Sequence, residues 1–522
     1  MTRISPAWTA RLVALLAGLA AGLAHPPFGL LPGLVGYGLM MRLAETDGPN
    51  PLRSAFFRGW LAGVGYFAIS VWWITEAFLV DAATYGWMAP FALLLLAGGL
   101  ALFWGVAAWL YRLARPSGVW RVLVFAGCVA LVEWVRGWIF SGFPWNLPGE
   151  TWKAGSAPSQ AAALVGSYGL TWITVALAAS PALVFDAAPR KARAVALGVA
   201  AAVLVALYVG GGLRLSQPAP PNGAPRVRLV QANIDQKEKW RPENLALIFD
   251  TYLRLSQKPG PAPAVIVWPE GALPAVIDEL LQPGSPYVDR LAETLSPGQT
   301  LLMGANRAAL GEDGSVDYFN SLVALRRAPG GLQVTGVYDK HHLVPFGEYV
   351  PLGEIAGRIG LRSLVHMPED FTAGPEPRPL RPAGLPAFQP LICYEALFPE
   401  LVRGAISAGA DRPSWMLNIS NDAWFGATSG PWQHLNLASY RAIEAGLPIA
   451  RATPTGVTAM IDAYGRSARE DQLGQGQLGV VDAVLPPPLP PTPYARCGEG
   501  PFAMMLLISG LIVVAGRMIR RG

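Results

Sequence analysis

The distribution of hydrophobic positions divides the chain into two kinds of region. Residues 1–216 carry long, nearly uninterrupted apolar runs, and one more such run lies at 501–518. Each run approaches the roughly 20 residues that a helix needs to cross a bilayer. The pattern therefore predicts eight transmembrane helices, at residues 8–24, 29–45, 56–78, 86–111, 119–141, 161–185, 194–213 and 501–518.

The stretch between these helices has a different pattern. Short runs rich in β-branched residues, such as 226–234 and 264–270, alternate with helix-like stretches such as 241–256 and 434–445. This alternation is typical of a layered α/β domain. The sequence thus predicts a polytopic α-helical membrane domain joined to an α/β domain.

Proline-rich segments mark the boundaries of the α/β domain. QPAPPNGAP and PPPLPPTP are stiff, weakly apolar stretches of the kind found in linkers. Seven transmembrane helices are predicted in residues 1–216, followed by a linker at 217–225 and a catalytic domain at 226–485. A second linker at 486–500 then leads to the last transmembrane helix at 501–522.

Composition supports a membrane protein. Of the 522 residues, 52% are hydrophobic and only 14% are charged, which is too apolar for a soluble enzyme of this size. The net charge of +5 comes from basic residues at the ends of the predicted helices, and the rest of the chain carries more acids than bases. The basicity is a topology signal and excludes a nucleic-acid partner.

The basic connections alternate with connections that lack Lys and Arg. Connections 42–58, 112–121 and 190–193 are basic, whereas 25–28 and 79–85 contain no Lys or Arg. Basic loops stay in the cytoplasm, so both termini are predicted to be cytoplasmic and residue 217 to lie on the opposite face.

Three reactive side chains each follow a strand-like run. Glu270 follows AVIVWP, Lys340 ends a short extended run, and Cys393 stands where a strand-like run meets a helix-like one. One sheet edge could gather all three. A cysteine acts as an acyl acceptor when a carboxylate takes its proton, and a lysine can stabilise the oxyanion. Taken alone, Cys393 also fits a small buried hydrophobe, and the other two a buried ion pair.

No metal or cofactor site is predicted. The three cysteines, Cys128, Cys393 and Cys497, are too scattered for a disulfide framework or a cysteine-based zinc site. The histidines are also dispersed, and no Gly-rich nucleotide-binding loop is present.

Four motifs carry a resemblance to a known family. WPEGALP, DKHHLVPFGEYVP, ICYEALFP and NISNDAWFG are similar to the motifs of the nitrilase (carbon–nitrogen hydrolase) superfamily, and within it to the membrane-bound apolipoprotein N-acyltransferases. The resemblance implies an α-β-β-α sandwich with Glu270 as general base, Lys340 as oxyanion stabiliser and Cys393 as nucleophile. It also implies supporting roles for Glu348, Tyr394 and Glu395.

The resemblance further implies the reaction and its place. A phospholipid would give its acyl group to the cysteine as a thioester, and the N-terminal amine of diacylglyceryl-cysteine on an apolipoprotein would take it in a ping-pong transfer. This chemistry implies a multi-pass protein of the bacterial inner membrane with the catalytic domain on the periplasmic side.

Aromatic and apolar loops are candidate substrate contacts. Trp240 follows the first strand-like run, and Trp424 and Phe425 belong to AWFGATSGPW. Together with the segment 352–371, they could admit acyl chains from a neighbouring bilayer or form ordinary core.

Two other functions fit parts of the pattern. A membrane-tethered amidase or nitrilase would use the same three residues with water as acceptor, but eight helices exceed what tethering needs. A transporter with an inactive sensory domain is disfavoured by helix interiors that are nearly free of charge. Glu133 and Arg136 are exceptions, and the sequence leaves open whether they pair.

The topology leads to the first prediction. Alkaline phosphatase, which is active only outside the cytoplasm, should be active when fused after residue 220 and inactive when fused after residue 522, because an eighth helix returns the chain to the cytoplasm. A reporter that fluoresces only in the cytoplasm should give the opposite result. Equal activity at both positions would remove the eighth helix.

Overall fold

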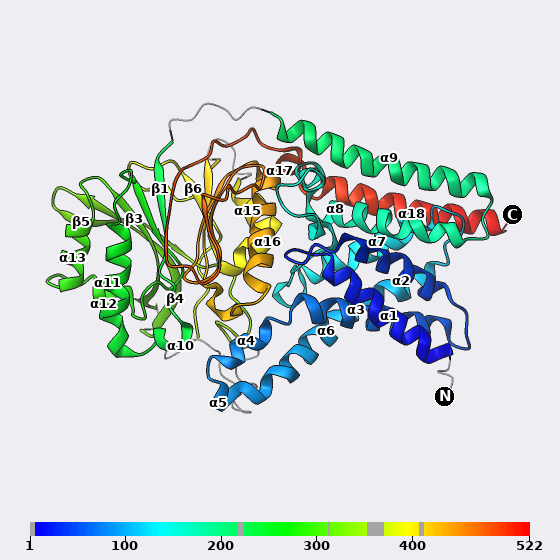
Figure 1. Cartoon of the computed structure of the whole chain (residues 1–522), viewed down its shortest axis with the longest axis horizontal. Coiled ribbons are helices and arrows are strands. Elements are labelled where there is room, and N and C mark those ends of the chain that lie inside the picture. Colours follow the sequence, from blue (N-terminus) through cyan, green and yellow to red (C-terminus); the bar gives the residue numbers. More distant parts are fainter. Residues whose placement is uncertain (1–5, 218–223, 312–313, 352–369, 407–411, 522) are drawn as a thin grey trace. The chain divides into compact units, whose positions relative to one another are not determined.

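A computed structural model describes residues 6–217, 224–311, 314–351, 370–406 and 412–521. The chain forms two compact units (Figure 1). The first contains residues 1–218, 428–444 and 491–522, and the second contains residues 219–427 and 445–490.

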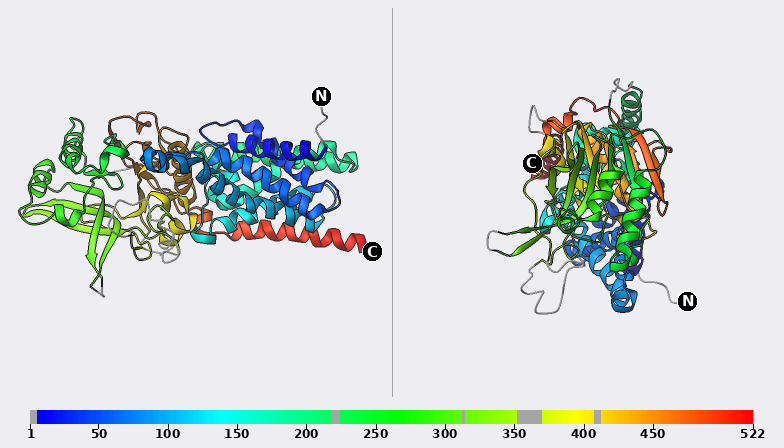
Figure 2. Two further views of the ribbon diagram at one scale, coloured as in Figure 1. Left: turned by 90° about the horizontal axis from the view of Figure 1, so that it is seen from below. Right: turned by 90° about the vertical axis from the view of Figure 1, so that its left-hand side faces the viewer.

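The first unit is helical, and every predicted apolar segment contains a helix. Its long helices run alongside one another in both views (Figures 1 and 2). They are α1 (Pro6–Leu23), α2 (Val35–Glu45), α3 (Pro51–Ser70), α6 (Ala89–Ala114), α7 (Arg121–Arg136), α8 (Ala162–Ala179), α9 (Arg190–Leu215) and α18 (Gly500–Arg521).

Four helical stretches in the described part of the chain are long and apolar enough to cross a membrane. They are Ala82–Ala114, Pro158–Phe185, Arg190–Leu215 and Gly500–Met518. The remaining helices of this unit are shorter or less apolar, as α2 with its 11 residues illustrates.

Glycines allow three of these helices to pack closely. A Cβ on Gly18 of α1 would lie 1.7 Å from the carbonyl oxygen of Ala62 in α3, and one on Gly63 of α3 would lie 2.8 Å from Ala101 in α6. Such contacts require glycine because the two backbones touch, which is how helices associate where water does not drive packing.

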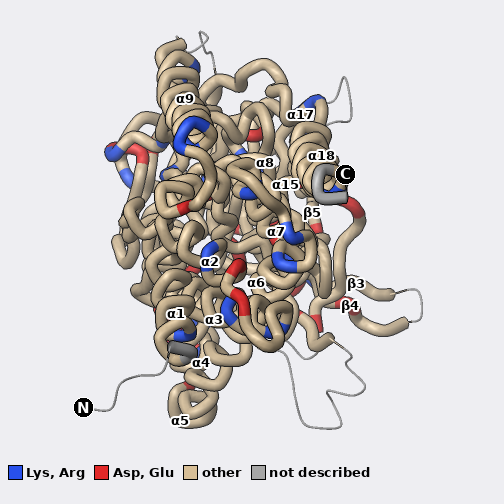
Figure 3. Tube along the Cα trace, turned by 90° about the vertical axis from the view of Figure 1, so that its right-hand side faces the viewer, with Lys and Arg blue, Asp and Glu red and all other residues tan. Residues whose placement is uncertain are grey.

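Basic residues gather at one end of this unit. Figure 3 shows Lys and Arg at the ends of several helices, on the side where both termini lie. Arg121, at the start of α7, pairs with Glu45 at the end of α2 (2.6 Å) and with Asp186. Arg112, near the end of α6, pairs with Asp47. The connections that the sequence identifies as basic therefore lie close together.

Glu133 and Arg136 of α7 form a buried ion pair, which answers the question that the sequence left open. Trp104 Nε1 donates to Glu133 Oε1 (2.6 Å), and the Arg136 guanidinium lies 5.1 Å from the ring centre of Phe67. The pair is satisfied on both sides, as a buried pair must be.

One helix of the first unit comes from the middle of the α/β sequence. In α16 (Gly430–Ala445), the buried Arg441 pairs with Glu444 (3.0 Å) and with Glu150 (3.3 Å), which precedes α8. Tyr440 donates its hydroxyl hydrogen to the carbonyl oxygen of Trp152 (2.6 Å). These contacts fix α16 within the helical unit.

The second unit contains two β-sheets. The six-stranded sheet has the order β11-β1-β2-β3-β4-β5, and the five-stranded sheet has the order β10-β9-β8-β7-β6. Strands β1, β2 and β3 are mutually parallel, as are β6, β7 and β8. The strands are β1 (Arg226–Gln231), β2 (Val265–Trp268), β3 (Thr300–Leu310), β4 (Val316–Ala328), β5 (Gly331–Asp339), β6 (Phe388–Ile392), β7 (Trp415–Ile419), β8 (Ile449–Ala452), β9 (Thr458–Ile461), β10 (Gln472–Leu473) and β11 (Gly479–Val484).

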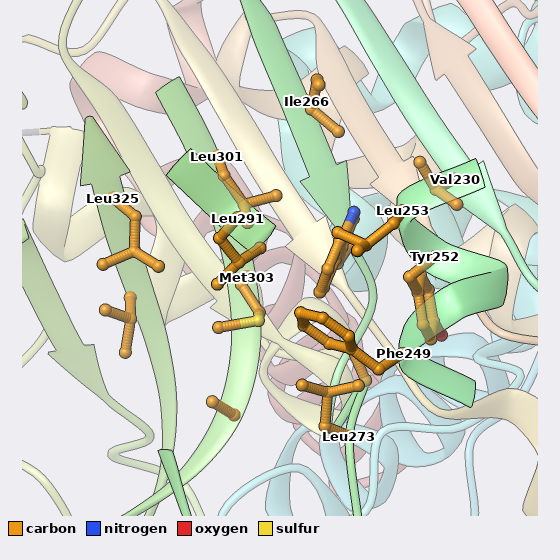
Figure 4. Packing of buried hydrophobic residues seen from close by; sticks show 14 of the residues in the cluster. Val230, Phe249, Tyr252, Leu253, Ile266, Leu273, Leu291, Leu301, Met303 and Leu325 are labelled. Carbon is orange, nitrogen blue, oxygen red and sulfur yellow. The ribbon is translucent and has the colours of Figure 1, made fainter. Parts of the chain in front are cut away.

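Successive side chains of a strand point to opposite faces of the sheet, and on the buried strands both faces contribute to a hydrophobic layer. On β2, Val265 and Val267 face the second sheet, where they pack with residues such as Trp415, and Ile266 and Trp268 face the helices. The helices on that side are α11 (Leu245–Ser256), α12 (Ile277–Leu280) and α13 (Pro286–Thr294). Figure 4 shows this outer layer. Because these strands are buried on both faces, their sequences are apolar throughout and do not alternate between apolar and polar residues.

The glycine contacts lead to the second prediction. Gly18→Ala should destabilise the helical unit by about 1–3 kcal/mol, because the added methyl group meets backbone and the helices must separate. The unfolding temperature of the protein in detergent should therefore fall. Gly99→Ala is the matched control in α6, since a Cβ there meets no atom within 4 Å. Equal unfolding temperatures for the two variants would contradict the close approach.

Candidate functional site

Three strand ends of the second unit carry the predicted reactive residues. Glu270 lies two residues after β2, Lys340 directly follows β5, and Cys393 directly follows β6. The prediction that each ends a strand is confirmed. Electrostatic interactions of Cys393 with both Glu270 and Lys340 place the three side chains in one site.

Lys340 is the buried centre of a carboxylate cluster. Its Nζ lies 2.9 Å from Glu348 Oε1 and 3.6 Å from Glu270 Oε1, and the residue is 1% exposed. Asn320 of β4 links the two acids, because its Nδ2 donates to Glu270 Oε1 (2.7 Å) and to Glu348 Oε1 (2.8 Å). Both carboxylates therefore have fixed positions.

The cluster sets the protonation of Lys340. Burial alone would lower the pKa of Lys340, but the carboxylates of Glu348 and Glu270 outweigh burial and hold that pKa above its ordinary value. The side chain thus remains an ammonium ion and a hydrogen-bond donor. This is the protonation state that stabilising an oxyanion requires.

The second oxygen of Glu270 is also held. Oε2 accepts a hydrogen bond from the backbone N–H of Asn421 (2.6 Å), just after β7. The carboxylate is therefore oriented by β4 on one side and by the β7 loop on the other. An oriented carboxylate beside a cysteine is suited to take a proton.

Cys393 has an unusual backbone conformation. Its φ is +51°, in the left-handed region that residues other than glycine rarely adopt. This turn redirects the chain at the end of β6 and is the kind of local strain that occurs at functional sites. The residue as a whole is partly exposed.

The environment of Cys393 favours the neutral thiol in the free protein. Burial raises the pKa of Cys393, the charge of Glu270 raises it further, and Lys340 and a hydrogen bond with Ser420 act in the opposite direction. Because the thiolate is the nucleophile, the proton must leave as the reaction proceeds. Glu270 is the adjacent group that can accept it.

Glu395 connects the Cys393 turn to the segment around Lys340 through hydrogen bonds. Its Oε1 accepts from the Tyr338 hydroxyl (2.8 Å) and from the backbone N–H of His341 (2.9 Å), and its Oε2 accepts from the backbone N–H of Ile392 (2.8 Å). Burial raises the pKa of this carboxyl, and the N–H donors and Lys340 oppose that effect. Glu395 therefore acts on the geometry of the site.

Tyr394 is buried in a small aromatic group. Its ring centre lies 5.6 Å from that of His342 and 5.0 Å from that of Phe398. The group adds a hydrophobic contact to the hydrogen bonds of Glu395, so two adjacent residues hold the same junction.

A second buried polar chain lies behind the cysteine. Ser420, which bonds to the thiol, donates its own hydroxyl hydrogen to Asp422 Oδ1 (2.7 Å). Asp422 Oδ2 accepts from Arg451 of β8 (2.7 Å), and the guanidinium of Arg451 also contacts Asn418. All four side chains are buried, and their hydrogen bonds stabilise the loop after β7, although Arg451 Nε has no partner among the described residues.

The predicted substrate contacts lie on two loops. Trp240 ends the short helix α10 (Gln236–Lys239), and Trp424 and Phe425 belong to a 3-10 turn, Asp422–Phe425. All three side chains are half-buried. Most of the third predicted contact, 352–371, lies outside the described residues.

Sequence reasoning missed several members of the site. Asn320 interrupts a buried strand with an amide, and this is a usable signal, because a polar side chain in such a strand needs partners. Lys239 of α10 was also missed. It is 3% exposed, and burial lowers its pKa to about 8 while Glu270 opposes that shift. Within QKEKW nothing distinguishes it from the exposed Lys237.

Within the described residues, no group of three or more His, Cys, Asp and Glu side chains could hold a metal ion. The site instead consists of an acid, an ammonium and a thiol at strand ends of a two-sheet α/β unit. This fold and site define a carbon–nitrogen hydrolase domain, and the model of the carbon–nitrogen hydrolase family matches residues 226–488.

Comparison with known proteins identifies the branch. The model of the apolipoprotein N-acyltransferase N-terminal domain matches residues 17–180. Apolipoprotein N-acyltransferase of Caulobacter vibrioides is 54% identical, covering 97% of this chain and 94% of that protein. The enzymes of Rhodopseudomonas palustris (38% identical, covering 97% and 95%) and Brucella melitensis (39%, covering 93% and 91%) are also similar. The chain belongs to the apolipoprotein N-acyltransferase family.

The contacts of Glu395 lead to the third prediction. Glu395→Gln replaces an acceptor oxygen with an N–H2 group that faces backbone or hydroxyl donors, so we expect the free energy of unfolding to fall by about 1–3 kcal/mol. Formation of the acyl-enzyme should also slow, because the Cys393 turn loses its attachment to Tyr338 and His341. Single-turnover kinetics and thermal unfolding measure the two effects.

Glu279→Gln is the control, since Glu279 of α12 is exposed. It should change neither quantity. Wild-type kinetics and stability in Glu395→Gln would show that the junction between β5 and β6 does not depend on this carboxylate.

Proposed function

We propose that Glu270, Lys340 and Cys393 carry out a ping-pong acyl transfer from a membrane phospholipid to the N-terminal amine of diacylglyceryl-cysteine on an apolipoprotein. Membership of the apolipoprotein N-acyltransferase family supports acyl transfer in lipoprotein maturation. The observation that carries the roles is a buried ammonium held between two carboxylates beside a partly exposed cysteine.

The first half-reaction forms the thioester. Glu270 takes the proton of the Cys393 thiol, and the sulfur bonds to the carbonyl carbon of the phospholipid ester. The carbonyl electron pair moves to oxygen, where the Lys340 ammonium stabilises the negative charge. Collapse breaks the bond to the glycerol oxygen, Glu270 returns the proton to that oxygen, and lysophospholipid leaves.

The second half-reaction uses the same groups. The neutral amine of the lipopeptide attacks the thioester carbon, and Glu270 accepts the proton that nitrogen loses. The carbon–sulfur bond breaks, an amide forms and Cys393 regains its proton. Glu348 and Asn320 position Lys340 and Glu270 throughout, and Tyr394 and Glu395 position the cysteine.

Transfer also requires that water stay away from the thioester. A thioester beside a general base hydrolyses unless the direction of attack is blocked. The half-buried Trp240, Trp424 and Phe425 are the described side chains that we assign to the acyl chains and to this exclusion. No cofactor or metal enters these steps.

We further propose the arrangement in the membrane. Eight helices cross the bacterial inner membrane, and an α-β-β-α domain of residues 226–485 faces the periplasm between linkers 217–225 and 486–500. Support comes from the clustering of Arg121 and Arg112 with acids at one end of the helical unit, as expected for cytoplasmic connections.

The mechanism gives the fourth prediction. With phospholipid alone, the protein should release one equivalent of lysophospholipid per Cys393 and then stall, because the thioester awaits an amine. Mass spectrometry should find the acyl group on Cys393. Addition of a diacylated lipopeptide with a free amine should restart turnover, whereas the same peptide with a blocked amine should not.

The variants separate the roles. Cys393→Ala should form no adduct, and Cys128→Ala and Cys497→Ala should behave as wild type. Glu270→Gln should bind lipid but acylate slowly. Steady release of fatty acid without peptide would identify a hydrolase, and an acyl group on Cys128 or Cys497 would refute the assignment of the nucleophile.

A further inference from the structure

A second lysine beside Glu270 is buried and makes no ion pair with a described residue. Lys239 is 3% exposed, and its Nζ makes no ion pair or hydrogen bond among the described residues. Nζ makes a cation–π contact with Trp240, whose ring centre lies 5.5 Å away. Lys340, by contrast, has two carboxylates. The charge of Glu270 acts on Lys239, but no described carboxylate forms an ion pair with it. A cation in a largely buried residue is stabilised by a close anion, so Lys239 points to a negatively charged ligand.

An amide donor with no acceptor lies one turn away. Gln236 Nε2 is buried without a partner, while Gln236 Oε1 accepts from Asn421 Nδ2 (3.3 Å). Asn421 Oδ1 is also unpartnered. Exchanging oxygen and nitrogen in both amides still leaves one N–H2 and one C=O unpaired, so the pair offers one donor and one acceptor in either assignment. Positions three apart on α10 lie on the same side.

These groups adjoin the reacting carboxylate. Asn421, which holds Gln236, donates its backbone N–H to Glu270 Oε2. A Cβ placed on Gly271, the residue after Glu270, would lie 3.3 Å from Lys239 Nζ. The ammonium and the unpaired amide are therefore next to the general base, and the amide pair adjoins the carboxylate oxygen that Asn320 does not contact.

The required ligand carries a negative charge and at least two acceptor oxygens close to an acyl ester. We infer that Lys239, with the amide pair Gln236 and Asn421, binds the phosphodiester of the phospholipid that donates the acyl group. The phosphate oxygens accept from Nζ and from the amide N–H2 group, and a hydroxyl or amine of the head group donates to the remaining C=O.

The acceptor substrate does not meet these requirements. Its reacting end is an amine, which would be repelled by the ammonium of Lys239 while protonated. The phosphate site therefore serves only the first half-reaction. It holds the donor ester a few bonds from the phosphate, and it empties when lysophospholipid leaves.

This inference rests on the proposed function, and it is tested on the acylation step of the full-length protein in detergent. Lys239→Met removes the charge but keeps an unbranched apolar stem. Acylation of Cys393 by phospholipid should slow about 10- to 100-fold, the loss expected for one charge-assisted hydrogen bond. Acylation by p-nitrophenyl palmitate, which has no phosphate, should stay within about twofold of wild type.

Three controls make the result specific. Lys237→Met removes the exposed lysine of the same helix and should leave both rates unchanged. Lys239→Arg should recover part of the phospholipid rate, because it restores the charge. If Lys239→Met does not fold, Lys239→Gln takes its place.

Each outcome decides one point. Equal slowing with both donors would show that Lys239 acts on the chemistry and would overturn the phosphate site, as would a wild-type phospholipid rate in Lys239→Met. Inhibition of the p-nitrophenyl palmitate reaction by inorganic phosphate would assign the site to free phosphate and overturn the lipid assignment. Failure of phospholipid to acylate the wild-type protein would instead refute the proposed function.

Discussion

A buried positive charge must be balanced, and the site around Lys340 follows from that constraint. An ammonium ion with 1% exposure is stable only with close anions, and Glu348 and Glu270 supply them. Two carboxylates near each other repel, so each needs further donors, which Asn320 and the backbone N–H of Asn421 provide. Balancing one charge thus links the ends of β2, β5 and β7 to the interior of β4.

The turn that carries the nucleophile is held by hydrogen bonds and not by ion pairs. Cys393 stands in a left-handed turn that the local sequence does not favour, and Glu395 stabilises the turn by accepting from Ile392 on one side and Tyr338 on the other. The site therefore has two independent supports. The ionic cluster fixes the acid and the lysine, and the hydrogen bonds of Glu395 fix the cysteine relative to them.

Sequence patterns were sufficient for the strand ends and insufficient for the contacts between them. Glu270, Lys340 and Cys393 could be predicted because each follows a strand-like run, which is a local signal. Two partners of Glu395, Tyr338 and His341, lie more than 50 residues earlier in the chain, so no periodicity indicates them. A helix at 434–445 could be predicted, but not its packing within the helical unit, because an apolar stripe does not specify its partner.

The placement of α16 bears on how separable the two units are. The chain leaves the second unit at residue 428, contributes α16 to the helical unit and returns at residue 445 to build β8. Residues 219–490 produced alone would carry a helix whose Arg441 and Tyr440 have lost Glu150 and Trp152. The α/β unit is therefore not a detachable module. The chain passes between the units at four places, so cleavage of one linker leaves three of them intact. A separate α/β fragment would also expose the side chains of α16 that are buried in the helical unit.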